Sequence, residues 1–458
     1  MTSSPSGFVV CMPYVAITLL TVALTNFKWS LSCIFLNNLT VYKIPDKDML
    51  KDQQEKANNK GVKPPSAARQ RKNAAKMNSK LKEKIYNQLA IAATSKEGLM
   101  QRLFFAEYDK LVFFFVAVLV NLCAFQMLSY HREHQGGGAV LTCLALVALG
   151  TGIVSLLTTQ LQTLVSPRAE RITSVLVGAA SVLVAILLLV LVPREVLDFE
   201  VDTAAAALTT SLQTTLMKFD MSNPIGEVPV FYLQTFLAIM AGLIGGVTVA
   251  PAVRSVRCYM VATSPPEWAE AHLGEPMWIK LLMHLNIVLP MAIIVLWVKP
   301  LLEQPLEISP NLTLYLQIGA SIFASVLQLS LIRPQVQSYL DSGLVAWYER
   351  CYGVQGAQMS TAERDFQNTG VRLMLELNST LICKIAVQTV APAIMLLSCA
   401  ALLWHKGVET KDVHPTSLVP PVVFKAVFSF LLWWYCVVWS TVAGTTLALF
   451  RIGYILHY

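Results

Sequence analysis

Residues 172–192 read ITSVLVGAASVLVAILLLVLV, a run of twenty-one residues without a charged side chain. An α-helix rises about 1.5 Å per residue, so this run is long enough to cross the roughly 30 Å hydrocarbon core of a bilayer. Similar runs recur at 8–27, 111–128, 139–157, 228–253, 281–298, 308–332, 385–404 and 426–450. Backbone polar groups in lipid need partners within their own segment, and the alternation of a transmembrane barrel is absent. The sequence therefore predicts an all-α, polytopic transmembrane helical bundle of about nine spans.

Composition excludes a soluble domain of this size. Hydrophobic residues make up 55% of the 458 residues, charged residues only 14%, and the mean hydropathy is +0.55. Soluble domains carry roughly 25% charged residues. The net charge of +7 comes from one place, because residues 43–84 hold thirteen Lys or Arg against five Asp or Glu. A single basic segment thus accompanies a nearly neutral, apolar body.

The predicted organisation follows from these runs. It comprises a first span with its exit (1–42), a basic linker (43–101), spans two to seven (102–340), an amphipathic segment (341–380) and the last two spans (381–458). Within the amphipathic segment, Leu344, Val345 and Trp347 stand among charged residues, a pattern typical of helices that lie at a membrane face.

Loop charges predict the orientation. The first run has no Lys or Arg before it, unlike a signal peptide, so we interpret it as a retained span. Lys and Arg concentrate in alternate loops, which places the N-terminus outside and the C-terminus in the cytoplasm, in a plasma membrane or endomembrane. Sequons occur at Asn38, Asn311 and Asn378, and only Asn311 falls on the outer side, as a possible glycosylation site.

The basic linker lies next to a span on the side where anionic lipids gather. Each nearby basic residue would be attracted to anionic headgroups by roughly 1 kcal/mol. The alternative is a solvated tether that only enforces orientation. Nucleic-acid binding is not expected, because no aromatic residue is interleaved with the charges between Tyr42 and Tyr86.

No pattern of catalytic, cofactor-binding or metal-ligating residues is present. The chain has no HExxH, GxSxG or P-loop, and its nine cysteines are scattered singly, without a CxxC pair. We therefore predict no catalytic residue, cofactor or metal site, and a protein that is not an enzyme. Small residues at 238, 242, 246 and 250 form a ridge that permits close helix packing, either internally or in a dimer.

Few polar residues fall within the predicted spans. His284 and Lys384 are the ionisable ones, and no Asp or Glu is expected inside a span. We expect His284 to bond between helices and Lys384 to extend to the headgroup region. Pro290 and Pro392 should interrupt the hydrogen bonding of their helices. In the alternative of a channel, His284, Asn286, Gln317 and Gln388 would line a polar path.

Several motifs resemble one family. His284, Asn286 and Pro290, followed by Leu296-Trp297-Val298-Lys299-Pro300, resemble the sixth-span signature of the transmembrane protein 161 family, which has A and B forms. Residues 104–108 (FFAEY), Val390-Ala391-Pro392 and Trp433-Trp434 resemble other parts of that family in the same order. Residues 136–192 match it only in hydropathy, as in a distant member.

The resemblance implies a fold and a field of activity but no ligand-binding residues. Members of the family are linked to ion currents and membrane excitability, without an established catalytic activity. Our first hypothesis is a non-enzymatic regulator of other membrane proteins such as ion channels, with membrane proteins as possible partners. The alternatives are a channel or facilitator with a neutral polar path, and a lipid-binding or lipid-moving protein.

Overall fold

The computed structural model describes residues 15–19, 22–23, 31–43, 90–131, 137–162, 166–218, 229–266, 273–301, 310–352, 375–408 and 419–453. Its elements are α2 (Leu31–Leu36), β1 (Thr40–Lys43), β2 (Ala90–Ala93), α5 (Lys96–Met100), α6 (Phe105–His131), α7 (Gly137–Leu161), α8 (Arg168–Leu191), α9 (Val201–Lys218), α10 (Val230–Thr263), α12 (Met277–Val295), α14 (Pro310–Ser330), α15 (Ile332–Tyr352), α17 (Ile382–Val408) and α18 (Pro421–Ile452). Among these residues the strands form one antiparallel pair, with Thr40 opposite Ala93. The prediction of an all-α bundle is confirmed.

Eight helices in the described part of the chain are long and apolar enough to cross a membrane. They are α6, α7, α8, α10, α12, α14, α17 and α18, and each overlaps one of the expected apolar runs. The first expected run, 8–27, falls mostly outside the described residues. The longest of the eight, α10, has 34 residues and is therefore about 50 Å long, which exceeds the hydrocarbon core.

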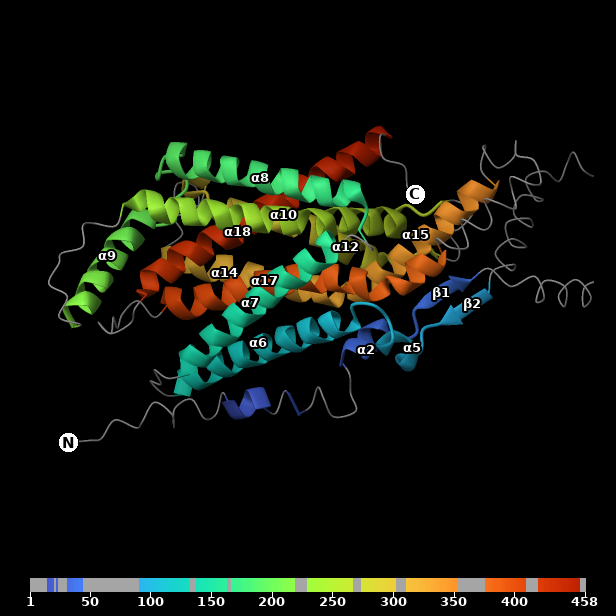
Figure 1. Cartoon of the computed structure of the whole chain (residues 1–458), viewed down its shortest axis with the longest axis horizontal. Helices are drawn as coiled ribbons and strands as arrows, with labels where there is room; N and C mark the ends of the chain where they lie inside the picture. The colour runs from blue at the N-terminus through green and yellow to red at the C-terminus, as the bar shows by residue number, and fades with distance from the viewer. Residues whose placement is uncertain are drawn as a thin grey trace, which may run out of the picture.

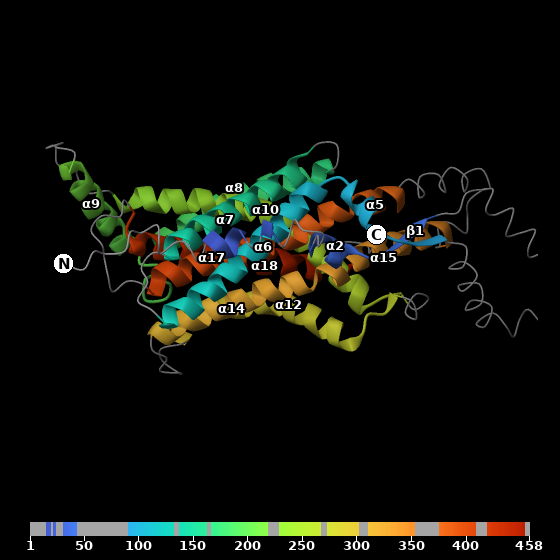
Figure 2. The ribbon, with the colours of Figure 1, turned by 90° about the horizontal axis from the view of Figure 1, so that it is seen from below.

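The eight helices run alternately up and down a single elongated bundle (Figure 1). At one end lie β1, β2, α5 and most of α15, and we call this the hairpin end. At the other end α9 projects beside the start of α10, and we call this the α9 end (Figure 2). Helices α8, α12 and α17 begin at the hairpin end, whereas α10 and α14 finish toward it.

Helix α17 forms the centre of the bundle. It packs against α6, α7, α14 and α18. In the most apolar stretch of 18 residues within α17, 94% of the residues are buried. The corresponding share is 17% for α8 and 22% for α12, which lie at the edge of the bundle. The core therefore surrounds α17, and the outer faces of α8 and α12 are left for lipid or for a partner.

The small-residue ridge of α10 packs against α8. A Cβ atom added at Gly242 would lie 2.3 Å from Val182 Cγ2 and 3.0 Å from the carbonyl oxygen of Gly178. A Cβ atom at Gly246 would approach the carbonyl oxygen of Ser174 to 3.1 Å. At these two positions the ridge makes an internal contact, and glycine is what allows the two backbones to approach so closely.

Helix α15 follows α14 after one residue and extends beyond the spanning helices at the hairpin end (Figure 1). The residues expected to face a membrane surface face protein instead, because Leu344, Val345 and Trp347 are all buried. Helix α15 packs against α10, α17 and β1. Residues 353–374, the middle of the amphipathic segment, lie outside the described residues, as does most of the basic linker.

Candidate functional site

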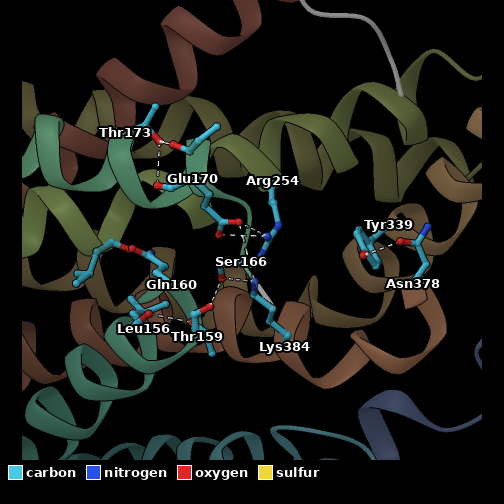
Figure 3. Close-up of polar contacts among 12 residues, drawn as sticks. Leu156, Thr159, Gln160, Ser166, Glu170, Thr173, Arg254, Tyr339, Asn378 and Lys384 are labelled. Atoms are coloured by element: carbon cyan, nitrogen blue, oxygen red, sulfur yellow. Dashed lines mark hydrogen bonds and ion pairs between the residues drawn. The ribbon is translucent and has the colours of Figure 1, made fainter. Parts of the chain in front are cut away.

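Three helices bring charged side chains together at the hairpin end (Figure 3). Glu170 of α8 accepts hydrogen bonds from Arg254 Nη2 of α10, at 3.2 Å for Oε1 and 3.0 Å for Oε2. Lys384 of α17 donates from Nζ to Ser166 Oγ at 2.8 Å, and its Nζ lies 4.0 Å from Glu170 Oε2. Ser166 in turn donates to the carbonyl oxygen of Thr159 on α7. We call Ser166, Glu170, Arg254 and Lys384 the charge cluster.

The charge cluster corrects two expectations. Lys384 does not extend to a headgroup region, because its side chain is 1% exposed and pairs inside the protein. A carboxylate does belong to a spanning helix, because α8 begins at Arg168 and places Glu170 in its first turn. There the carboxylate also interacts favourably with the positive end of the helix dipole. Sequence reasoning missed Glu170 because it began this span at residue 172.

A small polar cavity lies beside the cluster, and Arg254 belongs to both. The residues that line it are Pro251, Arg254, Ser255, Cys258, Asn286, Gln328, Gln335, Ile385, Gln388, Thr389 and Trp439. About 10 Å³ is available to the centre of a water-sized molecule, which is room for about one water. The lining comes from α10, α12, α14, α15, α17 and α18, so the cavity sits where most of the bundle meets.

Several polar atoms buried there have no hydrogen-bond partner. They are Nη1 of Arg254, both amide atoms of Gln388 and Oε1 of Gln328. The remaining amide atom of Gln328, Nε2, donates to the Tyr435 hydroxyl at 3.5 Å. A buried polar atom without a partner costs about 1–3 kcal/mol, so this concentration marks a place where a further group is needed.

Of the four residues proposed for a polar path, two line the cavity and two do not. Asn286 and Gln388 face it from α12 and α17. Gln317 bonds instead to the carbonyl oxygen of Leu296 at 2.8 Å, which joins α14 to the end of α12. His284 is exposed, its Nδ1 lies 2.6 Å from the carbonyl oxygen of Lys280 in its own helix, and its ring packs edge-on against Tyr259. The interhelical hydrogen bond expected for His284 is therefore wrong.

Prolines inside three helices each remove a helical donor from the carbonyl four residues earlier. For Pro251 that carbonyl belongs to Val247, and the side chain of Gln160 supplies the missing hydrogen bond from α7. Pro290 and Pro392 act in the same way on the carbonyls of residues 286 and 388. Both of these residues line the cavity, which adds acceptors to its surroundings.

The remaining predicted residues lie at the α9 end, away from the cavity. Trp297 donates from Nε1 to Ser429 Oγ at 2.8 Å, which ties α18 to the turn that carries Pro300. Lys299 pairs with Asp198 at 3.0 Å. Burial raises the pKa of Asp198, but hydrogen bonds from Glu200 N–H and from Lys299 outweigh it and hold the pKa below its ordinary value. These residues join the α8–α9 connection to the bundle and form no cavity with the cluster.

All three sequons lie within the described residues. Asn38 is exposed just before β1, and its N–H donates to the carbonyl oxygen of Thr94. Asn378 accepts a hydrogen bond from the Tyr339 hydroxyl at 3.0 Å, and its amide lies against Gly343 (Figure 3). Asn311 lies in the first turn of α14, at the α9 end. Asn311 and Asn378 therefore lie at opposite ends of the bundle, in agreement with the expectation that they face opposite sides of a membrane.

Comparison with known proteins identifies the family. A family model described as "Predicted transmembrane protein 161AB" matches residues 6–413. The chain belongs to the transmembrane protein 161 family. The match covers seven of the eight described spans, and only α18 lies beyond it. No solved structure matches the chain. Family membership and the apolar helices together establish an integral, multi-pass membrane protein.

The sequence did not predict that the residues of the charge cluster and of the cavity come together. From the sequence, Gln388 was expected to line a polar path in the alternative of a channel, and neither Arg254 nor Gln328 was assigned a role there. A signal was available for Glu170, because Pro167 is typical of a helix start and would move the start of α8 back to Arg168. No sequence signal indicated that α8, α10 and α17 would meet at this level.

Proposed function

We propose that this chain is a non-enzymatic membrane protein that regulates other membrane proteins, ion channels among them. The family link to ion currents suggests the field of activity. The observation that carries the proposal is the contrast between a closely packed centre and apolar outer faces on α8 and α12. Such a molecule would act through its surface within the membrane rather than through a pore of its own.

The packing along α17 argues against a polar path through the bundle. Ala391 and Met395 lie two helical turns beyond Lys384 and Gln388, on the same face of the helix. Helix α7 closes over them, since a Cβ atom added at Gly152 would lie 3.1 Å from Met395 Cγ. Buried polar side chains on α17 are thus separated by buried apolar ones, which an ion would cross only at high cost.

The orientation proposed from the loop charges suits this role. The hairpin end would face the cytoplasm, because Arg254, Lys280 and Arg333 all lie toward it. Residues 44–89, which make up most of the basic linker, connect β1 to β2 and would therefore start and finish at the cytoplasmic face, where anionic lipid headgroups attract them. In this arrangement the linker and α15 form the cytoplasmic surface available to a partner.

Reconstitution of the purified protein in liposomes tests the first half of the proposal. We expect no ion flux above that of empty liposomes under gradients of K⁺, Na⁺ and Cl⁻. A reproducible and selective flux would contradict the proposal, more so if Gln388→Leu abolished it without lowering the amount of folded protein. That outcome would favour the second candidate function, a channel or facilitator whose path begins at the cavity lined by Asn286 and Gln388.

Expression in cells that lack this protein tests the second half of the proposal, namely regulation of other membrane proteins through the outer face of the bundle. Wild-type protein should restore the native membrane current, and Leu183→Trp with Leu187→Trp on the exposed face of α8 should not. Met127→Trp provides the control, because Met127 is also exposed, somewhat more than the two leucines, but lies on α6. Equal surface expression of the variants is required. Equal restoration by the α8 variants would remove the α8 face from the proposal.

A further inference from the structure

The cavity at the hairpin end has the electrostatic character of an anion site. Among the described residues, Arg254 is the one charged residue in its lining, and none of their carboxylates reaches the wall. Its other polar groups are two hydroxyls, the Cys258 thiol, the Trp439 indole N–H and the amides of Asn286, Gln328, Gln335 and Gln388. A cation placed here would meet the positive charge of Arg254 without a carboxylate to offset it. The lining therefore favours a ligand that is neutral or negative.

Each of the three side chains that carry unpartnered atoms can present a donor to such a ligand, the guanidinium through Nη1 and each amide through its nitrogen. Arg254 Nη1 carries two N–H groups with no acceptor, and the Gln388 amide is without a partner at either atom. The orientation of a glutamine amide is an assignment, and rotation exchanges its nitrogen and oxygen. If the Gln328 amide is rotated, the Tyr435 hydroxyl donates to its oxygen, and its nitrogen becomes free to face the cavity. Three side chains of the same lining then offer N–H groups.

Charge decides between water and an anion. One water molecule makes at most about four hydrogen bonds, so it could satisfy several of these atoms, but it brings no negative charge. Glu170 binds only Nη2 of Arg254, and it also lies 4.0 Å from Lys384. The guanidinium thus shares its carboxylate with a second cation while Nη1 faces away from both oxygens. An anion bound at the buried Nη1 would compensate the charge of this partly buried guanidinium, whereas water would not.

Size then restricts the class of anion. The space holds the centre of about one water-sized molecule, so sulfate, phosphate and a lipid headgroup are too large. We propose that the cavity formed by Arg254, Gln328 and Gln388 binds a monatomic monovalent anion of the chloride class. Such an anion would bridge α10, α14 and α17 beside the charge cluster and would tie the packing of the bundle to the local chloride concentration.

Thermal unfolding in nanodiscs tests the site. Chloride replaces gluconate at a constant ionic strength of about 0.15 M, and intrinsic tryptophan fluorescence reports the Tm. We expect chloride to raise the Tm of the wild type by about 2 °C or more, because a ligand that binds the native state stabilises it. Gln388→Met should lose this shift. Gln317→Met is the matched control, since Gln317 is a buried glutamine bonded to Leu296 outside the cavity, and it should keep the shift.

Chloride nuclear magnetic resonance on the wild type provides a measurement that no variant can confound. Binding should broaden the chloride line beyond that of empty nanodiscs, and bromide should reverse the broadening by competition. Two results would overturn the proposal: a wild-type Tm that is the same in chloride and gluconate, or broadening that Gln388→Met retains in full. The first would assign the cavity to an ordered water, and the second would place chloride elsewhere.

Discussion

Helices α8 and α17 are both apolar enough to span a membrane, yet they occupy opposite environments. Helix α8 has the highest mean hydropathy of the eight, and only 17% of its most apolar window is buried. Helix α17 carries Lys384, Gln388, Ser398 and His405, and 94% of its window is buried. In a soluble protein the more apolar helix would be the buried one and the more polar helix would lie at the surface. In lipid the outside is as apolar as the core, so polar residues must turn inward and the most apolar helix can remain at the edge.

The comparison teaches that polar residues, rather than apolar ones, indicate the centre of this bundle. Helix α8 contacts the bundle at Gly178, which packs closely against α10, and at Glu170, which pairs with Arg254 in the charge cluster. Four experiments would test or refine this contrast, from the largest expected effect to the smallest.

The charge cluster should produce the largest loss of stability. Glu170→Gln keeps the shape of the side chain but leaves Arg254 and Lys384 beside a neutral group, which should lower the free energy of unfolding by about 3–5 kcal/mol. Glu200→Gln is the control, because Glu200 pairs with Lys425 at the α9 end with 41% of its side chain exposed, and should cost less than about 1 kcal/mol. Denaturation in mild detergent, followed by tryptophan fluorescence, measures both. Equal losses would refute the central role of the cluster.

Removing side-chain volume should separate the two helices next. Leu397→Ala on α17 creates a cavity at a fully buried site and should cost about 2–5 kcal/mol. Leu187→Ala on α8 removes the same atoms from a side chain that is 56% exposed, and should cost less than about 0.5 kcal/mol. The same unfolding assay compares them. A large effect at Leu187 would mean that a partner covers α8 in the purified protein.

Added volume at the α8–α10 contact should lower the free energy of unfolding by a smaller amount than Leu397→Ala does. Gly242→Ala places a methyl group closer than van der Waals distance to Val182 and the Gly178 carbonyl, and overpacking of this kind costs about 1–3 kcal/mol. Gly444→Ala on α18 has nothing within 4 Å and should change stability little. Unequal melting temperatures are expected, with Gly242→Ala the lower. If the two variants melt alike, α8 does not depend on this glycine.

The smallest effect should be a pH dependence at the hairpin end. Burial raises the pKa of Asp341 to about 7, although hydrogen bonds from Gln337 and Tyr42 lower it and Glu275 adds a further increase. Because the folded pKa lies above the unfolded one, protonation of Asp341 stabilises the docking of β1 on α15. That stability is fully present below about pH 4 and is lost as the pH rises through about 7.

Hydrogen exchange at residues 40–43, corrected for the intrinsic rate, measures this dependence. Between pH 6 and pH 8 we expect protection to fall by roughly tenfold, or about 1.4 kcal/mol. Asp341→Asn should remove the dependence, since an amide does not titrate over this range. Protection that falls equally in Asp341→Asn would assign the effect to another group.

Much of the fold could be predicted because lipid imposes a simple length and polarity rule. The apolar runs located eight described spans, and Pro290 and Pro392 were placed correctly inside helices. The candidate site was predicted only in part. Asn286, Gln388 and Lys384 were singled out, but Glu170 fell outside the expected span, and His284 was assigned an interhelical bond that it does not make. Hydropathy does not encode which way a side chain faces or which helices meet.

The sequence by itself determined that this protein is a multi-pass helical membrane protein, because a charge-free run of about twenty residues has few other stable environments. It also determined the family, through motifs that keep their order along the chain. Only the tertiary structure decided that α17 is central and α8 peripheral, and that Glu170, Arg254 and Lys384 share one site. Contacts between helices depend on rotation and depth about each axis, which a one-dimensional pattern of apolar residues leaves open when lipid and core are equally apolar.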